Sequence, residues 1–356
     1  MRPDRPPGQT RSMSIDFATV TDPDTDWSAV DAHLDEAGVN AVELSAGRIE
    51  FTAFDWAAHP DAAAEPGIDH LARAARGVQE TADGSTRQIG LIVDAYAPNW
   101  LADHPGAAGV AADGERGTYQ ASASELTSGE VGRRLVAYVG ALAERYDPSL
   151  ISISELFLSE YSFGTDDREL YTEMTGHPDW PRTPDGEIAE SDPSILAWRA
   201  EVIAGLLQRM RDAMDAARDG EGTRIDLVME VRVDWQDPAR GALESGHDYE
   251  VLLGPADRLL LWAYLYGIRH PVQIRRVLGA VDRAGVDMGR LGVSVGLWRE
   301  TPGAEQDEPI SVPTFRSALR AADSHGVTSV NVTPFTLMSD RYWTALAEYW
   351  NPEGDR

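Results

Sequence analysis

The chain has 356 residues, of which 42% are hydrophobic and 8% aromatic, which is ordinary for a globular protein with a buried core. Its formal net charge is −28, and all 31 of its Lys and Arg residues are arginine. So acidic a chain repels nucleic acid and anionic membranes, which makes both poor partner candidates, and the absence of cysteine excludes disulfides and thiolate chemistry. The acids are spread along the chain, a pattern typical of solubility in a salty, halophile-like cytoplasm.

The N-terminus is rich in proline and arginine and has no apolar stretch after its arginines. Residues 1–13, which begin with MRPDRPPGQTRS, are therefore expected to form a flexible lead-in and not a secretory signal. No apolar run reaches the ~18 residues that a membrane helix needs. We expect a cytoplasmic protein whose folded part spans residues 14–350.

From Ser14 onward, short β-rich runs alternate with amphipathic helical stretches. Eight strands are predicted: Ser14–Val20, Asn40–Ala46, Ile89–Tyr96, Leu150–Leu156, Ile225–Trp235, Arg258–Tyr266, Leu291–Trp298 and Ser329–Phe335. No linker interrupts the series. The pattern predicts an α/β fold with a single (β/α)8 TIM barrel.

Helix start signals lie between the strands. Asp26 is placed to cap the first long helix, and Asp192, followed by proline, is placed to cap the helix that begins near residue 193. Thr127 and Glu130 have the spacing of a capping box. We therefore expect three of the barrel helices to begin at these positions.

The connection after the fourth strand, from Tyr161 to Asp192, is long for a βα loop, where ~2–6 residues are usual. It is rich in acids, aromatic residues and turn formers. Long loops on the catalytic face commonly form lids or subsite walls. Asp166, Asp167 and Arg168 either contact a substrate there or form a surface network.

Polar residues occupy every second position along several predicted strands. Val42 and Leu44, for example, share one face, while Glu43 takes the other. Since the apolar face of a barrel strand must contact the helices, the polar face points to the barrel axis. Arg232 is expected to neutralise Glu230 or Glu43, and a structural role for these two acids stays open beside a functional one. The residues expected to face the axis are Asp16, Glu43, Asp94, Glu230, Arg232, Asp234 and Asn331.

Carboxylates and large aromatic residues recur where the predicted strands end, which is where (β/α)8 enzymes carry their active sites. Aromatic rings stack on the C–H faces of sugars, while carboxylates bind hydroxyl groups and transfer protons. The pattern favours a carbohydrate ligand. Besides the axis-facing residues, Glu155 and Glu160 are expected to line the site, with sugar platforms at Trp100, Trp235, Trp262, Tyr264 and Trp298.

Hydrolysis of a glycosidic bond needs two carboxyl groups, one to protonate the leaving oxygen and one to act as base or nucleophile. Glu155 falls where the fourth strand ends, among apolar neighbours that would raise its pKa toward the working range. We therefore expect Glu155 to be the general acid. Asp234 is the leading candidate for its partner, followed by Glu230 and Glu300.

Two resemblances bear on this prediction. A glutamate at the end of strand four resembles the acid/base of the clan A glycoside hydrolases, which carry their nucleophile at the end of strand seven. Here strand seven, in LGVSVGLWRE, offers Ser294, Gly296 and Trp298, and Glu300 lies beyond it. The order VNAVEL, GLIVDAYAP, ISELFLSEYSFG, DYEVLLGPADRLLLWAYL and VTPFTLMSD is similar to the hydrolase barrel of bacterial poly-N-acetylglucosamine processing proteins. That resemblance marks Glu155 and Glu160 as the acidic pair after strand four.

Two alternatives stay open. The segment AGVNAVELSAGR resembles the xylose-isomerase-like sugar isomerases and epimerases, which hold a divalent metal at their strand ends. All eight histidines fall in predicted helices or loops, so no metal is expected, although Glu43, Glu155 and Asp234 are available as ligands. The other alternative is a non-catalytic carbohydrate-binding barrel, because strand seven lacks a terminal acid. No glycine-rich phosphate motif occurs, so no cofactor is expected. Our prediction is a glycoside hydrolase that acts on a polysaccharide or oligosaccharide.

Overall fold

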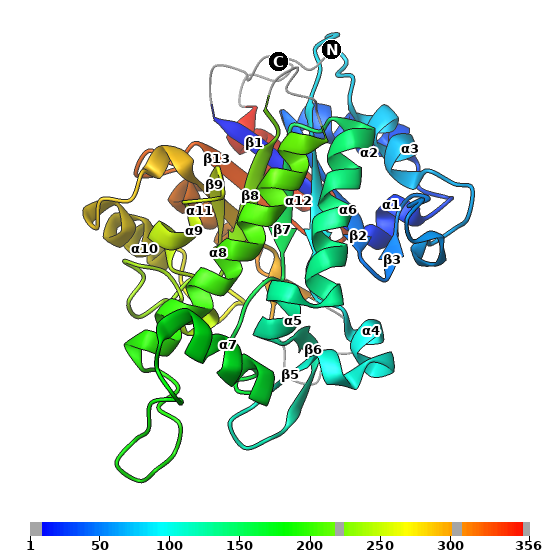
Figure 1. Ribbon diagram of the computed structural model, residues 1–356. Coiled ribbons are helices and arrows are strands. Elements are labelled where there is room, and N and C mark those ends of the chain that lie inside the picture. The colour runs from blue at the N-terminus through cyan, green and yellow to red at the C-terminus, as the bar shows by residue number, and fades with distance from the viewer. Residues whose placement is uncertain (1–8, 218–223, 301–307, 352–356) are drawn as a thin grey trace.

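The computed structural model describes residues 9–217, 224–300 and 308–351 of the chain. Within these ranges the chain forms a closed barrel of parallel strands surrounded by helices (Figure 1), which confirms the predicted (β/α)8 fold. Neighbouring strands follow the chain order, and β1 pairs with both β2 and β13, which closes the sheet. The barrel strands are β1 (Thr10–Ile15), β2 (Ala41–Arg48), β4 (Gln88–Asp94), β7 (Leu150–Ser154), β8 (Asp226–Val231), β9 (Arg258–Trp262), β10 (Leu291–Gly296) and β13 (Ser329–Thr333).

A helix follows each barrel strand before the next one begins. Asp26 and Asp192 cap two of these helices as predicted, since their carboxylates accept backbone N–H groups of the first turn at 2.9–3.1 Å. None of the described helices is long and apolar enough to cross a membrane. The helices are α2 (Trp27–Glu36), α3 (His70–Val78), α6 (Glu130–Tyr146), α8 (Pro193–Ala216), α9 (Tyr249–Leu252), α10 (Val272–Arg283), α11 (Val312–Ala322) and α12 (Asp340–Trp350).

The first strand begins earlier than predicted. β1 starts at Thr10 and pairs with β13 from that residue, so part of the expected lead-in belongs to the barrel. Residues 1–8 of the lead-in lie outside the described residues. The strand ends before Asp16 because that carboxylate accepts the N–H of Thr19 and caps a short helix, α1 (Phe17–Thr21).

The predicted capping box at Thr127 and Glu130 is wrong. Thr127 lies inside another short helix, α5 (Ala123–Ser128), where its hydroxyl donates to the carbonyl of Ala123 at 2.8 Å. The N-cap of α6 is Gly129. The carboxylate of Glu125 accepts the N–H of Val131 in the first turn of α6 at 2.9 Å, so a different acid satisfies this helix start.

Several connections at the carboxyl ends of the strands are elaborated. The predicted long loop after β7 contains a helix, α7 (Thr165–Thr175). A second excursion, between β4 and α6, was not foreseen. Figure 1 shows the two excursions together at the bottom of the view. Further short elements in the connections that follow the strands are β3 (Phe51–Thr52), η1 (Pro60–Ala62), α4 (Pro98–Asp103), η2 (Pro105–Ala107), β5 (Ala108–Val110), β6 (Arg116–Ala121), β11 (Trp298–Arg299), β12 (Glu308–Pro309) and η5 (Phe335–Leu337).

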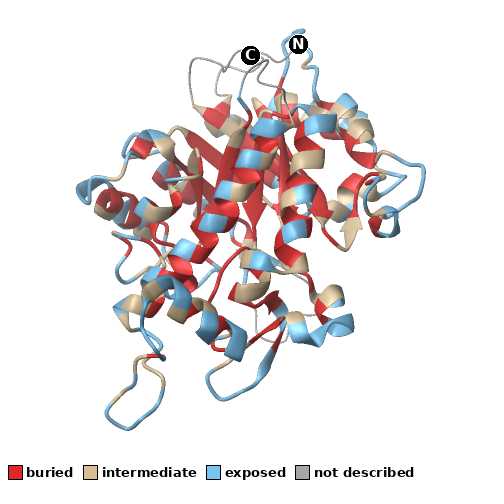
Figure 2. Ribbon diagram, viewed as in Figure 1, coloured by how far each residue is buried: buried red, intermediate tan, exposed pale blue. Residues whose placement is uncertain are grey.

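The barrel interior changes from apolar to polar along its axis. Near the amino ends of the strands, three side chains form a small apolar cluster that is separate from the main core: Leu150, Val228 and Leu260. Two residues further along the same strands come Ser152, Glu230 and Trp262. The residues of opposite parity, Ile151 and Ile153 among them, are fully buried in the main core. Figure 2 shows that the barrel strands are buried over most of their length. The alternation read from the sequence is therefore confirmed in these strands.

Candidate active site

The carboxyl ends of the strands surround one cavity of about 230 Å³, at the end of the barrel that we call the mouth. All eight barrel strands contribute residues to its lining. The position is the one at which (β/α)8 enzymes carry their chemistry. Among the predicted site residues, those that line the cavity are Asp16, Asp94, Glu155, Glu230, Trp262, Tyr264, Trp298 and Asn331.

Glu155 directly follows β7 and has a left-handed backbone with φ +55°. That conformation is uncommon for a residue other than glycine and often marks a functional site. Burial raises the pKa of Glu155, whereas a hydrogen bond from the Tyr119 hydroxyl and the charge of Arg232 oppose the rise. The carboxyl group thus faces the cavity with a donor and a cation beside it.

Asp94 is the last residue of β4 and lies in a less favourable place for a negative charge. Burial raises its pKa to about 7, and the charges of Glu230 and Glu155 add to the rise. Arg48 opposes it, but its guanidinium also pairs with Glu50 at 2.9 Å. Near neutral pH, Asp94 is therefore a carboxyl group that can still hold a proton.

Glu230 is buried and held from three directions. Its carboxylate accepts hydrogen bonds from Ser152 and Ser154, each at 3.1 Å, and from the indole N–H of Trp262 at 2.7 Å. Burial raises the pKa of Glu230, and these three donors oppose the rise. The carboxylate is fixed in one orientation and in turn fixes the indole ring of Trp262.

Glu43 and Asn331 form a layer beneath the cavity. The amide nitrogen of Asn331 donates to Ser12 and Ser14, each at 2.9 Å, and approaches Glu43 at 3.3 Å. Burial raises the pKa of Glu43 to about 7, although Ser12 and Asn331 bond to it. Both residues face the axis as predicted, but only Asn331 reaches the cavity.

The predicted ion pair between Arg232 and Glu230 or Glu43 is wrong. The strand β8 ends at Val231, so Arg232 lies beyond the alternation that would point it to the axis. Its guanidinium lies 3.5 Å from the ring centroid of Phe157. Glu230 needs no such partner because hydroxyl and indole donors surround it.

Asp234 is not brought into the cavity. Its carboxylate accepts the backbone N–H groups of Gln236 and Asp237, at 2.8 and 3.0 Å, and so stabilises a turn. The side chains of Glu160 and Glu300 are exposed and do not line the cavity either. The acidic partner of Glu155 therefore has to be sought among the carboxyl groups at the mouth.

Two of the predicted sugar platforms lie elsewhere. Trp100 stacks on His104, with ring centroids 4.2 Å apart, and the guanidinium of Arg134 lies 4.8 Å from the centroid of the Trp100 ring. Trp235 packs near Arg269, with the guanidinium 5.1 Å from its ring. The rings that do line the cavity are Phe17, Tyr96, Trp262, Tyr264 and Trp298.

The sequence patterns did not indicate that Tyr119 belongs to the site. It lies on β6, which pairs with β5 as an antiparallel hairpin within the excursion after β4, and its ring stacks on Tyr96 at 4.3 Å. The turn between the two strands contains Asp113 and Gly114, with φ +92° at the glycine. An Asp-Gly pair is a strong hairpin signal and could have revealed this excursion.

Metal ligation does not fit the described residues. In residues 9–217, 224–300 and 308–351, no three His, Asp or Glu side chains converge as a group that could hold a metal ion. No histidine lines the cavity at the mouth. The isomerase alternative therefore finds no ligand set in this part of the chain.

No protein-family model and no curated protein matches the sequence, but solved structures match its fold. The PgaB (BpsB) glycoside hydrolase domain from Bordetella bronchiseptica matches with a TM-score of 0.70 at 14% identity, over 96% of this chain and 98% of that one. A β-galactosidase from the Antarctic haloarchaeon Halorubrum lacusprofundi matches with a TM-score of 0.68 at 13% identity, over 95% and 57%. A β-galactosidase from Marinomonas ef1 gives 0.65 at 14% identity, over 95% and 58%.

These likenesses show the fold. The chain has a TIM barrel similar to that of the PgaB glycoside hydrolase domain and of the two β-galactosidases, a likeness that the sequence motifs led us to expect. It spans almost the whole of that domain and a little over half of the two β-galactosidases.

Proposed function

We propose that this protein hydrolyses a glycosidic bond in an oligosaccharide or polysaccharide, with Asp94 and Glu155 as the reacting carboxyl groups. The observation that carries the proposal is that both groups face one aromatic-lined cavity at the mouth, in different electrostatic surroundings. Glycoside hydrolysis needs two carboxyl groups of this kind, one protonated and one ionised.

Asp94 is the proton donor in this proposal. Burial and the charges of Glu230 and Glu155 raise its pKa to about 7, so a large fraction of the group is protonated at neutral pH. A general acid works best when its pKa is close to the working pH. As the bond breaks, Asp94 gives its proton to the leaving oxygen.

Glu155 is the ionised partner. Burial raises the pKa of Glu155, but the Tyr119 hydroxyl and the charge of Arg232 favour its carboxylate form, and Asp94 has no hydroxyl donor of this kind among the causes that shift its pKa. In that form it acts as a nucleophile on the anomeric carbon or as a base toward water. This reverses the role that the sequence suggested for Glu155, and it replaces Asp234 by Asp94 as its partner.

The aromatic rings at the mouth bind the sugar. Trp262, Tyr264 and Trp298 come from neighbouring parts of the barrel wall, with Tyr264 5.7 Å from Trp262 and 5.1 Å from Trp298 between ring centroids. Such faces stack on the C–H surfaces of a pyranose. Glu230 holds Trp262 in place through the indole N–H, as a positioning residue.

A comparison of leaving groups tests the proposal. Wild type, Asp94→Asn and Glu155→Gln are assayed on aryl glycosides of several sugars, with phenol leaving groups that range from poor to good. Asp94→Asn should lose hydrolysis of the poor leaving groups and retain much of it for dinitrophenolate, whose departure needs no proton. Glu155→Gln should lose hydrolysis of both.

The matched control is Glu300→Gln, since Glu300 is an exposed acid that does not line the cavity. It should behave as wild type. Equal losses for poor and good leaving groups in Asp94→Asn would overturn the role of Asp94. Sugar binding by calorimetry without any turnover in wild type would favour the carbohydrate-binding barrel over the hydrolase.

A further inference from the structure

A buried histidine lies beneath the mouth and outside the cavity. His247, in the connection between β8 and α9, is fully buried. Its Nδ1 accepts the backbone N–H of Arg232 at 2.8 Å, and its Nε2 lies 2.9 Å from the carbonyl oxygen of Leu156. A neutral imidazole has one donor and one acceptor, so the first bond leaves the proton on Nε2, which donates to Leu156.

The segment that carries His247 forms further hydrogen bonds to the loop after β7, which contains Leu156, and to the loop after β8, which contains Arg232. The carbonyl of Ser245, in the 3-10 turn η3 (Leu243–Ser245), accepts the N–H of Leu158 at 3.1 Å. The hydroxyl of Tyr249 donates to the carbonyl of Arg232 at 3.2 Å. Between them Gly246 has φ +75°, and a Cβ there would lie 2.8 Å from Ile203, so this tight turn requires glycine.

The two bonds of His247 act on residues at the mouth. Leu156 directly follows Glu155, whose left-handed backbone is held by its surroundings and not by local preference. Arg232 is the cation that faces Glu155, and its guanidinium lies over Phe157, two residues beyond Glu155. A shift of either loop would therefore change how the guanidinium and the carboxylate face each other.

We propose that His247 is a positioning residue. It fixes the position of Glu155 relative to Arg232 by forming hydrogen bonds to both of the backbone segments that carry them. Its catalytic consequence rests on the proposed function. Burial lowers the pKa of His247 to about 4, so the ring stays neutral and both bonds persist at neutral pH.

Two substitutions test the bridge. His247→Phe keeps the ring volume and removes both hydrogen bonds. His247→Asn keeps an acceptor near the position of Nδ1 for the amide of Arg232 and loses the bond to Leu156. The matched control is His70→Phe, because His70 is 1% exposed and lies at the start of α3, on another element.

The first measurement is the NMR titration of the Glu155 carboxyl in ¹³C-labelled protein, assigned with Glu155→Gln. The groups that interact electrostatically with this carboxyl are Asp94, Tyr96, Tyr119, Glu230, Arg232, Tyr264 and Tyr266. In His247→Phe the midpoint should rise by about one pH unit, since Arg232 is no longer held opposite Glu155. His247→Asn should show a smaller rise, and His70→Phe none.

The second measurement is hydrolysis of the aryl glycoside that wild type cleaves best. His247→Phe should lower kcat about 10²-fold and leave KM within about twofold, because the rings that bind sugar come from other strands. An unchanged Glu155 midpoint in a folded variant would overturn the inference, as would equal effects in His70→Phe. If His247→Phe does not fold, the same two measurements on His247→Asn decide whether His247 positions Glu155. If wild type cleaves no glycoside, the proposed function fails and the titration still decides on His247.

Discussion

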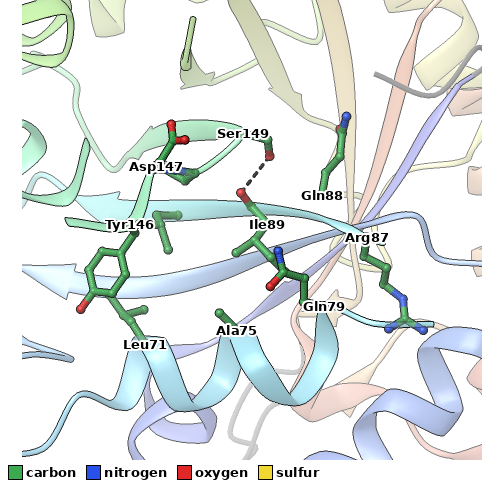
Figure 3. A pocket seen from close by; sticks show the side chains of 11 residues that line it. Leu71, Ala75, Gln79, Arg87, Gln88, Ile89, Tyr146, Asp147 and Ser149 are labelled. Atoms are coloured by element: carbon green, nitrogen blue, oxygen red, sulfur yellow. Dashed lines mark hydrogen bonds between the residues drawn. The ribbon is translucent and has the colours of Figure 1, made fainter. Parts of the chain in front are cut away.

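Buried charged groups are arranged differently at the two ends of the barrel. At the amino ends of the strands, the buried guanidinium of Arg87 pairs with Asp31, at 2.5 Å, and with Asp35. Arg87 also lines a cavity of about 280 Å³ between α3, β4 and the start of β7 (Figure 3), where the hydroxyl of Ser149 donates to Ile89. At the mouth, by contrast, burial raises the pKa values of Asp94, Glu155 and Glu230, and the charges of Arg48 and Arg232 oppose this rise only in part.

This difference separates what stabilises the fold from what the site does. Pairing a buried cation with acids removes an uncompensated charge, whereas grouping buried acids destabilises the folded state. Clustered carboxyl groups with raised pKa values are a feature of catalytic clefts. Substitutions at the mouth should therefore lower activity and leave stability unchanged, whereas substitutions at the amino ends of the strands should lower stability and leave activity unchanged.

The largest effect is expected at the mouth. Glu155→Gln should lower hydrolysis by about 10³-fold, because it removes one of the two reacting groups, and Asp94→Asn should do the same with poor leaving groups. Neither should lower the melting temperature, since each removes a buried acid from beside other acids. Kinetics and thermal unfolding check both points. More than a tenth of wild-type kcat in Glu155→Gln would contradict the expectation.

The next effect is expected at the opposite end. Arg87→Met should lower the free energy of unfolding by about 3 kcal/mol, because it leaves Asp31 and Asp35 without their buried cation. The activity of the folded enzyme should not change. Urea unfolding provides the measurement. The control is Arg133→Met, which removes an exposed pair with Glu130 and should cost about 0.5 kcal/mol or less.

The layer beneath the mouth should make stability depend on pH. Because burial raises the pKa of Glu43 to about 7, the folded state keeps a proton that the unfolded state releases near 4.5. The free energy of unfolding should thus fall as pH rises from about 4.5 to about 7, with Glu43 contributing up to about 3 kcal/mol. Glu43→Gln should flatten this part of the curve. Exposed Glu36→Gln serves as control, and an equal flattening there would refute the assignment.

The smallest effect separates the aromatic residues. Trp298 lines the cavity, so Trp298→Ala should raise KM about three- to tenfold. Trp235 packs near Arg269 outside the cavity, and Trp235→Ala should leave KM within about twofold. Steady-state kinetics compare the two. A larger rise for Trp235→Ala would mean that substrate binds beyond the cavity described above.

The barrel and its polar axis could be predicted because both follow local rules. Alternation along the strands placed Glu43, Asp94, Glu230 and Asn331 inside, and the strand end placed Glu155 at the mouth. These predictions need only the period of two and the fixed direction of the strands.

What could not be predicted depends on contacts between distant segments. Extending the alternation past the end of β8 misplaced Arg232 and Asp234, because nothing local marks Val231 as the last strand residue. Tyr119 reaches Glu155 only through an excursion that begins after β4, and His247 acts through backbone groups 15 and 91 residues away. Local patterns carry no information on such partners.

The pH dependence of kcat/KM tests most directly whether Asp94 and Glu155 form the reacting pair. We expect a bell-shaped profile in wild type that falls above about pH 7 as Asp94 loses its proton and falls at lower pH as Glu155 gains one. In Asp94→Asn the alkaline decrease should disappear while the acidic one remains. An alkaline decrease that persists unchanged in Asp94→Asn would contradict the assignment of Asp94 as the proton donor.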